Sequence, residues 1–242
     1  MSATSYRTAL TGALLLAGAA LAAAEPPPAA PSSPAAAPAP DRNPDLNRAQ
    51  QLVFMNDLMQ RVPAGSTLDY RFTRHGKDLP DYQDRVTVTV ARVAADGTRD
   101  LAFDFLSGGC HLDFKPVIGY RGNPTPIHFL ERDIKELADA TTGAIGYFRN
   151  RIRGAFAHPA IQPVKITLAD REVDGIQIRI TPFVDDPNID RLKDYAHKRY
   201  DFLFSEQVPG GLYQIRTTVP AASGDTPLIE EQLTFDHQTP GT

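Results

Sequence analysis

Cysteine and tryptophan are scarce in this chain of 242 residues, which contains one cysteine and no tryptophan. Because a disulfide needs two thiols, Cys110 cannot form one within the chain, and the fold must depend on the burial of apolar groups. Long apolar runs are also missing after the first 24 residues, and a membrane-spanning helix requires about 20 apolar residues. The sequence therefore predicts no transmembrane segment in the mature chain.

An excess of positive charge is missing as well, because 25 lysine and arginine residues stand against 29 aspartate and glutamate residues. Nucleic acids attract proteins through clustered positive charge, so this mildly acidic balance argues against a nucleic-acid partner. No glycine-rich loop follows a strand and opens a helix in the manner of a phosphate-binding motif. We therefore expect no nucleotide and no other cofactor.

Signatures of catalysis and of metal binding are absent from the sequence. The Gly-x-Ser-x-Gly pattern of serine hydrolases does not occur. Cys110 and His111 are neighbours, and adjacent residues on a strand point to opposite faces, so such neighbours rarely form a nucleophile and base pair. The six histidines lack the short paired spacing of metal ligands. Although Asp104, His111 and Asp113 lie close in sequence, they fit solvated strand-end residues better than ligands, and we predict no metal site.

The first 24 residues have the order of a secretory signal peptide. Arg7 supplies a positive charge, an apolar run extends from Leu14 to Leu21, and three alanines precede Glu25. A bacterial lipoprotein needs a cysteine directly after the cleavage point, and this chain has Glu25 there. We therefore expect an unanchored protein in the periplasm of a Gram-negative-type bacterium.

Two regions follow the predicted signal peptide. Residues 25–42 are rich in proline and alanine and bury too little apolar surface to fold, so they are predicted to be a disordered linker. Residues 43–242 are enough for a sizeable hydrophobic core and are expected to form a single domain.

Alternation of apolar and polar residues predicts eight or nine strands. The alternating segments are residues 68–72, 86–90, 101–105, 164–168, 176–180, 200–204, 213–219 and 229–235. Turns at Asp96-Gly97, Asp174-Gly175 and Pro209-Gly210-Gly211 are expected to join neighbouring strands, and such short turns make the neighbours antiparallel. In the last segment, Glu231 interrupts an otherwise apolar face.

Helical spacing of apolar residues occurs at the start of the expected domain and between the two groups of strands. Asn43 as a cap and Pro44 at the first helical position predict a helix that ends at Pro63. A second helix is expected from Thr125 to the Thr141-Thr142-Gly143 cluster, with an apolar face of Ile127, Leu130, Ile134 and Leu137.

Residues 145–158 have an ambiguous pattern. An apolar face at helical spacing favours a helix, whereas Arg149, Arg151 and Arg153 alternate as they would on a strand. We favour the helix, because alanine-rich sequence continues up to Pro159. A short helical turn is also expected within residues 189–199.

This order of elements predicts an α+β fold, a curved antiparallel sheet with helices packed on one face. The signal peptide, the N-terminal helix, the aromatic-rich strands and the helical insert at residues 127–158 together resemble the periplasmic lipoprotein-carrier superfamily, which has the Lol-type fold. The resemblance implies a half-barrel whose concave face is covered by helices. It is a resemblance of architecture, without a diagnostic motif, and implies no functional residues.

Two groups of residues are candidates for ligand contacts. If the sheet curves, aromatic side chains on its strands are candidates to line a pocket for an apolar or lipid ligand, although the same pattern also fits an ordinary core: Tyr70, Phe72, Phe103, Phe105, Phe202, Phe204 and Tyr213, with Phe114 near them. The basic run Arg149, Arg151 and Arg153 is a candidate anion-binding site, or else pairs with nearby carboxylates.

Three hypotheses of function follow from these observations. The first is an exported, non-catalytic protein that binds a hydrophobic or lipid-like ligand or docks to an envelope protein. The second is a periplasmic hydrolase whose site is assembled from residues distant in sequence, such as Asp104, His111, His128 and Arg149. The third is a structural envelope protein whose proline-rich and alanine-rich leader sets its reach.

Overall fold

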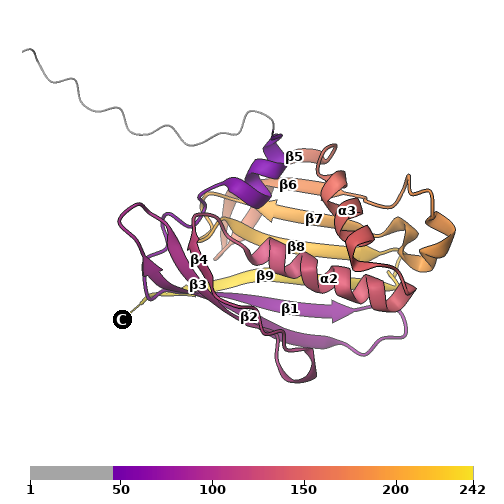
Figure 1. Cartoon of the computed structure of the whole chain (residues 1–242), viewed down its shortest axis with the longest axis horizontal. Helices are drawn as coiled ribbons and strands as arrows, with labels where there is room; N and C mark the ends of the chain where they lie inside the picture. The colour runs from indigo at the N-terminus through magenta and orange to yellow at the C-terminus, as the bar shows by residue number, and fades with distance from the viewer. Residues whose placement is uncertain (1–45, 242) are drawn as a thin grey trace, which may run out of the picture. The chain divides into compact units, whose positions relative to one another are not determined.

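In the computed structural model, residues 46–241 are described, and they build an open, curved antiparallel sheet of nine strands with helices on one face (Figure 1). The strands are β1 (Thr67–His75), β2 (Tyr82–Val93), β3 (Arg99–Phe105), β4 (Val117–Tyr120), β5 (Ala160–Leu168), β6 (Arg171–Ile180), β7 (Arg199–Phe204), β8 (Leu212–Val219) and β9 (Ile229–Thr239). Their order across the sheet is β4-β3-β2-β1-β9-β8-β7-β6-β5. The predicted α+β class and curved antiparallel sheet are confirmed.

The connection between the two halves of the sheet explains why the helices lie where they do. β1 to β4 run from the centre to one edge, β5 to β9 run from the other edge back to the centre, and β1 and β9 pair at the middle. The chain must therefore cross from β4 at one edge to β5 at the other. It does so through α2 (Thr125–Thr141) and α3 (Ile145–Ala155), which span one face of the sheet (Figure 1).

Both central helices agree with the predictions. The helix predicted from Thr125 to the Thr141-Thr142-Gly143 cluster is α2. Residues 145–158 contain α3 rather than a strand. Phe148 and Ile152 are buried one helical turn apart, so the apolar spacing and not the alternating arginines determined the structure. The turn expected near residue 189 is present as two short 3₁₀ helices, Ile189–Arg191 and Lys193–His197.

The N-terminal helix is shorter than predicted, which corrects the proposed end at Pro63. It begins with α1 (Arg48–Gln50), capped by Asn47, and continues as one π-helical segment to Met55, after which Asn56 is extended. The later apolar residues Leu58 and Val62 lie in turns. The Asn47 side chain accepts from the Gln50 backbone as a helix cap does, and it also donates to Phe156 O at 2.7 Å. The predicted cap Asn43 and Pro44 lie outside the described residues.

The predicted turn at Asp174-Gly175 is also wrong, because both residues lie inside β6. The chain turns instead at Ala169 and Asp170, which have positive φ angles of 46° and 63°. Position 175 needs a glycine because the Ile166 side chain lies close to its backbone. A Cβ there would lie 2.3 Å from the Ile166 Cδ1 atom. Strand β4 was missed, because its four residues form no clear alternation.

Two predictions concern residues outside this range. The signal peptide at residues 1–24 and the linker at residues 25–42 lie outside the described residues, as do the first residues of the expected domain. Within residues 46–241, no helix has the length and apolarity needed to cross a membrane.

Candidate binding site

Most of the aromatic residues selected from the sequence are part of the packed core under the helices. Five of them have exposed fractions of at most 2%: Tyr70, Phe72, Phe105, Phe202 and Phe204. Phe103 and Tyr213 are half-buried and pack against that core. Phe103 and Phe114 enclose the His128 ring, with centroids at 4.2 and 4.1 Å. Apart from Phe204, these residues line neither of the two cavities described below.

An apolar groove of about 430 Å³ lies instead among α2, α3 and residues 46–58, which we call the N-terminal segment. Leu130, Ile134, Ile152 and Phe156 are buried side chains at its base, with exposed fractions of 6% or less. Met55 is 54% exposed at its edge. The complete lining is Leu46, Gln50, Phe54, Met55, Ile127, Leu130, Glu131, Ile134, Arg149, Ile152, Arg153 and Phe156.

Helical spacing places these residues on the walls of the groove. On α2, Ile127, Leu130, Glu131 and Ile134 follow the i, i+3, i+4, i+7 pattern of one helix face. On α3, Arg149, Ile152 and Arg153 share a face in the same way. The sequence shows the apolar face of each helix. It predicts that both faces belong to the core, because a sequence pattern shows which residues are apolar and not what covers them.

The N-terminal segment forms the third wall and is fixed to α3 at two points. The Asn47 amide donates to the backbone oxygens of Phe156 at 2.7 Å and Ala157 at 3.1 Å, which occupies carbonyls at the end of α3. The Phe54 ring meets the Phe156 ring edge-on with centroids 5.0 Å apart. Tyr120 also donates its hydroxyl to Phe54 O at 3.1 Å.

The predicted basic run divides between two sides of α3. Arg149 and Arg153 line the groove, whereas Arg151 places its Nε 2.7 Å from Asp186 Oδ2. This division follows from helical geometry, since residues four apart share a face and residues two apart do not. The sequence alone suggested three equivalent arginines, and the structure brings two of them together.

The two arginines at the groove differ in their partners. Arg149 donates to both carboxylate oxygens of Glu131, at 2.8 and 2.6 Å, and this bond lowers the pKa of Glu131. Arg153 donates only to the neutral Asn150 side chain, at 3.3 Å, among the described residues. The groove edge therefore carries one compensated positive charge and one uncompensated positive charge.

A buried ion network holds α2 against the sheet. Arg132 on α2 donates to Glu231 on β9 at 2.6 and 3.2 Å, and it also reaches Glu136 at 2.8 Å. Asp133, also on α2, accepts from Lys198 and from the Tyr200 hydroxyl. The Arg132 and Glu231 side chains are 6% and 2% exposed, so this contact fixes the helix that forms one wall of the groove.

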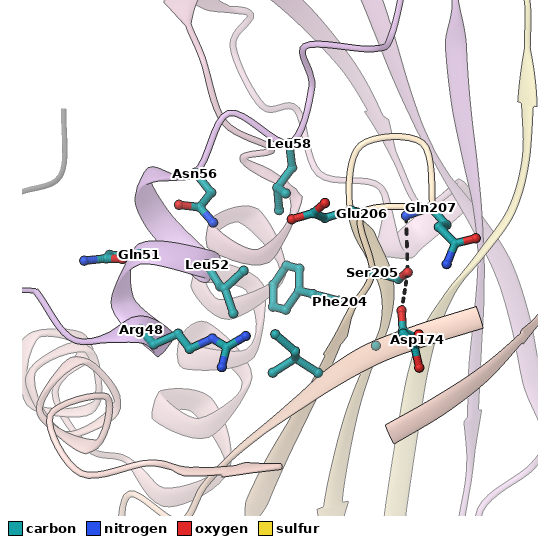
Figure 2. A pocket seen from close by; sticks show the side chains of 12 residues that line it. Arg48, Gln51, Leu52, Asn56, Leu58, Asp174, Phe204, Ser205, Glu206 and Gln207 are labelled. Atoms are coloured by element: carbon teal, nitrogen blue, oxygen red, sulfur yellow. Dashed lines mark hydrogen bonds between the residues drawn. The ribbon is translucent and has the colours of Figure 1, made fainter. Parts of the chain in front are cut away.

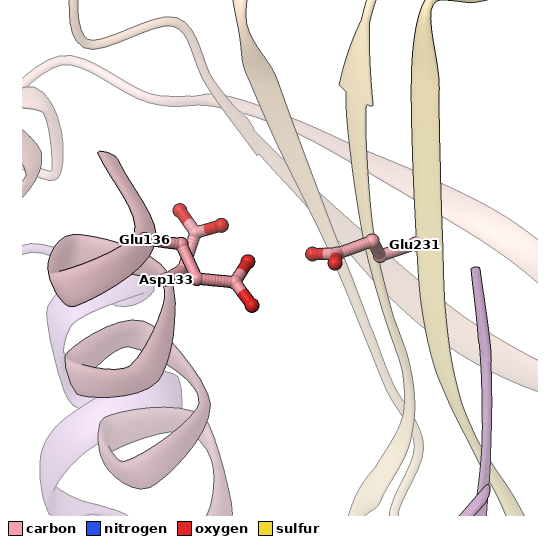
Figure 3. Close-up of side chains that lie close together, drawn as sticks. All are labelled: Asp133, Glu136 and Glu231. Atoms are coloured by element: carbon pink, nitrogen blue, oxygen red, sulfur yellow. The ribbon is translucent and has the colours of Figure 1, made fainter. Parts of the chain in front are cut away.

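The carboxylates of this network have the spacing of a metal site but not its charge balance. One oxygen each from Asp133, Glu136 and Glu231 lies within 4.8 Å of the others, and Figure 3 shows them facing one another from α2 and β9. Arg132, Lys198 and Arg74 supply three compensating positive charges. Burial alone would raise the pKa of Glu231, but Arg132 holds it below its usual value. The cluster is therefore an ion-pair network.

The residues of the hydrolase hypothesis have separate surroundings. His111 lies 3.6 Å from Asp104 in a largely exposed pair. His128 lies between two aromatic rings, and burial lowers its pKa to about 4. Arg149 is held by Glu131. Neither described cavity is lined by either histidine, and Cys110 is exposed on a 3₁₀ turn.

No protein-family model and no curated protein sequence matches this chain. Similar solved structures include the lipoprotein LppX of Mycobacterium tuberculosis, which is 12% identical with a TM-score of 0.31, over 74% of this chain and 88% of that chain. LprF from Mycobacterium bovis is 15% identical with a TM-score of 0.30, over 78% and 92% of the two chains.

A third similar structure is a LolA superfamily protein from Nitrosomonas europaea. It is 8% identical with a TM-score of 0.23, over 80% of this chain and 94% of that chain. The name of the Nitrosomonas europaea protein places that protein in the superfamily that the present sequence resembles.

Proposed function

We propose that this chain is a non-catalytic binding or carrier protein for an amphiphile with an apolar tail and an anionic head group. The tail occupies the groove among the N-terminal segment, α2 and α3, and the head group lies beside Arg153 and Arg149. The observation that carries the proposal is the groove itself, whose base is apolar and whose edge holds an uncompensated arginine. Hydrolysis would need converging reactive groups, and the described contacts favour no such site.

The size and lining of the groove are adequate for such a ligand. A volume of about 430 Å³ lies within the ~300–1,000 Å³ range of small-molecule sites. Each methylene group that leaves water contributes about 0.8 kcal/mol, so six buried methylenes contribute roughly 5 kcal/mol before the cost of association. The head group adds charge-assisted hydrogen bonds, which select anionic amphiphiles over neutral ones.

A titration with a dansyl-labelled fatty acid and its methyl ester tests this function. Ile127→Glu places a charge in the groove and should weaken binding of both probes by about tenfold or more. Arg153→Gln should weaken the acid by about three- to tenfold and leave the ester unchanged. Circular dichroism checks that each variant is folded.

Matched controls come from exposed residues elsewhere. Ile118 on β4 is 68% exposed and the Arg71 side chain is 59% exposed, and neither lines the groove. Ile118→Glu and Arg71→Gln should bind both probes as the wild type does. Absence of probe binding by the wild-type chain, or equal losses in groove and control variants, would refute the proposal.

We also propose that the protein works in the periplasm, as the signal-peptide pattern of residues 1–24 indicates. N-terminal sequencing of protein from a periplasmic fraction should give a chain that starts at Glu25. Retention of residues 1–24 in that fraction would contradict cleavage. Docking to an envelope protein remains a prediction from the sequence.

A further inference from the structure

A second cavity, of about 520 Å³, also borders the N-terminal segment and is shown in Figure 2. The N-terminal segment contributes Arg48, Gln51, Leu52, Asn56 and Leu58 to it. β6 contributes Asp174, Gly175 and Ile176, and the end of β7 with its turn contributes Phe204, Ser205, Glu206 and Gln207. The two cavities share no lining residue and are therefore separate sites.

The cavity has an apolar base and a polar rim. Phe204 is 2% exposed and lies at the centre of the view in Figure 2, beside Leu52. Arg48 extends from the N-terminal segment on one side of Phe204, and Glu206 lies on the other side (Figure 2). A ligand in this cavity therefore contacts an apolar surface between two groups of opposite charge.

The charged groups on the two sides of the cavity have no partner within residues 46–241. No hydrogen bond or ion pair in that range involves the guanidinium group of Arg48 or the carboxylate of Glu206, and both residues are exposed. The Arg61 guanidinium donates to the Glu206 backbone oxygen at 3.3 Å and not to its carboxylate. Asp174 differs, because Lys165 lies 2.7 Å from its carboxylate. The side-chain amides of Asn56 and Gln207 are likewise without a hydrogen-bond partner in the described part of the chain.

The remaining rim residues are already fixed. Ser205 donates its hydroxyl to Asp174 O at 2.6 Å and accepts from the Gln207 backbone at 3.2 Å, which holds the turn after β7 in place. Gln51 donates its amide to Leu46 O at 2.9 Å. The site therefore offers a preformed turn that presents Glu206, opposite a helical segment that presents Arg48.

We infer that this second cavity binds a small zwitterion with an apolar body, of which a short apolar peptide with free ends is the representative class. Its carboxylate binds Arg48, its ammonium group binds Glu206, and its apolar side chains cover Phe204 and Leu52. The neutral amides of Asn56 and Gln207 are positioned along the rim for the peptide group. This site is separate from the amphiphile groove and does not depend on the function proposed for it.

Charge balance disfavours three simpler ligands. An inorganic anion would gain from Arg48 but would face the Glu206 carboxylate, and a cation would gain from Glu206 but would face Arg48. A fully apolar ligand would cover Phe204 and Leu52 but would gain nothing from either charged group. A zwitterion satisfies both groups at once, and the volume lies within the usual range for small ligands.

Binding of the dipeptide Leu-Leu to the full chain, followed by NMR amide shifts, tests the inference. The wild type should bind Leu-Leu about three- to tenfold more tightly than either N-acetyl-Leu-Leu or Leu-Leu-amide, since each capped form loses one charge contact. Amide shifts should include Glu206 and residues of the N-terminal segment. The absence of any binding at about 10 mM, or equal binding of all three peptides, would overturn the inference.

Two variants assign each end of the ligand to its residue. Arg48→Gln should remove the discrimination against Leu-Leu-amide and retain that against N-acetyl-Leu-Leu, whereas Glu206→Gln should do the reverse. Arg153→Gln, in the other cavity, should leave peptide binding unchanged, and Arg48→Gln should leave fatty-acid binding unchanged. Loss of the same discrimination in both single variants, or of both ligands in Arg48→Gln, would contradict two separate sites.

Discussion

The buried contact between Arg132 and Glu231 should be among the most sensitive polar interactions in the described structure. Glu231→Gln removes the partner of a guanidinium group whose side chain is 6% exposed, and it leaves that charge in a poorly solvated position. Breaking a buried ion pair in this way typically costs about 3–5 kcal/mol. Because Glu136, 42% exposed, still lies 2.8 Å from Arg132, we expect the low end, about 3 kcal/mol.

Urea unfolding at neutral pH measures this loss directly. The matched control is the exposed pair of Arg71 and Asp236, whose side chains are 59% and 49% exposed, so Asp236→Asn should cost under about 1 kcal/mol. The double variant Arg132→Met with Glu231→Leu removes both charges and should recover most of the stability. If Glu231→Gln cost no more than Asp236→Asn, the network would not fix α2 as we argue.

Three further predictions concern single residues. The pKa of His128 is lowered to about 4 by burial, so its neutral form stabilises the fold above its usual pKa of 6.5 and this contribution is lost as pH falls toward 4. An NMR titration of the His128 ring should show a midpoint well below 6, and a midpoint at 6 or above would contradict its burial. Gly175→Ala should lower the free energy of unfolding by about 2 kcal/mol, because the new Cβ would meet Ile166. A thermal melt measures this change, and a loss below about 0.5 kcal/mol would show that the strand adjusts freely. Cys110→Ser should leave stability within about 0.5 kcal/mol and fatty-acid binding unchanged, because the thiol is exposed; a selective loss of function would assign it a role.

The sequence determined the elements whose signals are local. Alternation in β1, β2, β3 and β7 and helical spacing in α2 and α3 were sufficient, because each pattern reflects which face of one element is buried. Local signals failed where a distant contact decided the structure. Gly175 looked like a turn residue, but it lies in a strand because the Ile166 side chain approaches its backbone. Asn47 caps α1 and also bonds to the end of α3, a contact that no local pattern predicts.

Only the tertiary structure decided where a ligand has room. The sequence identified the aromatic strand faces and the arginines of α3, but α2 and α3 cover most of the aromatic residues, and helical geometry separates Arg151 from Arg149 and Arg153. Arg132 and Glu231 are 99 residues apart, so no local pattern links them. A sequence shows which side chains avoid water, and a cavity exists only where the packing of distant elements leaves such side chains uncovered.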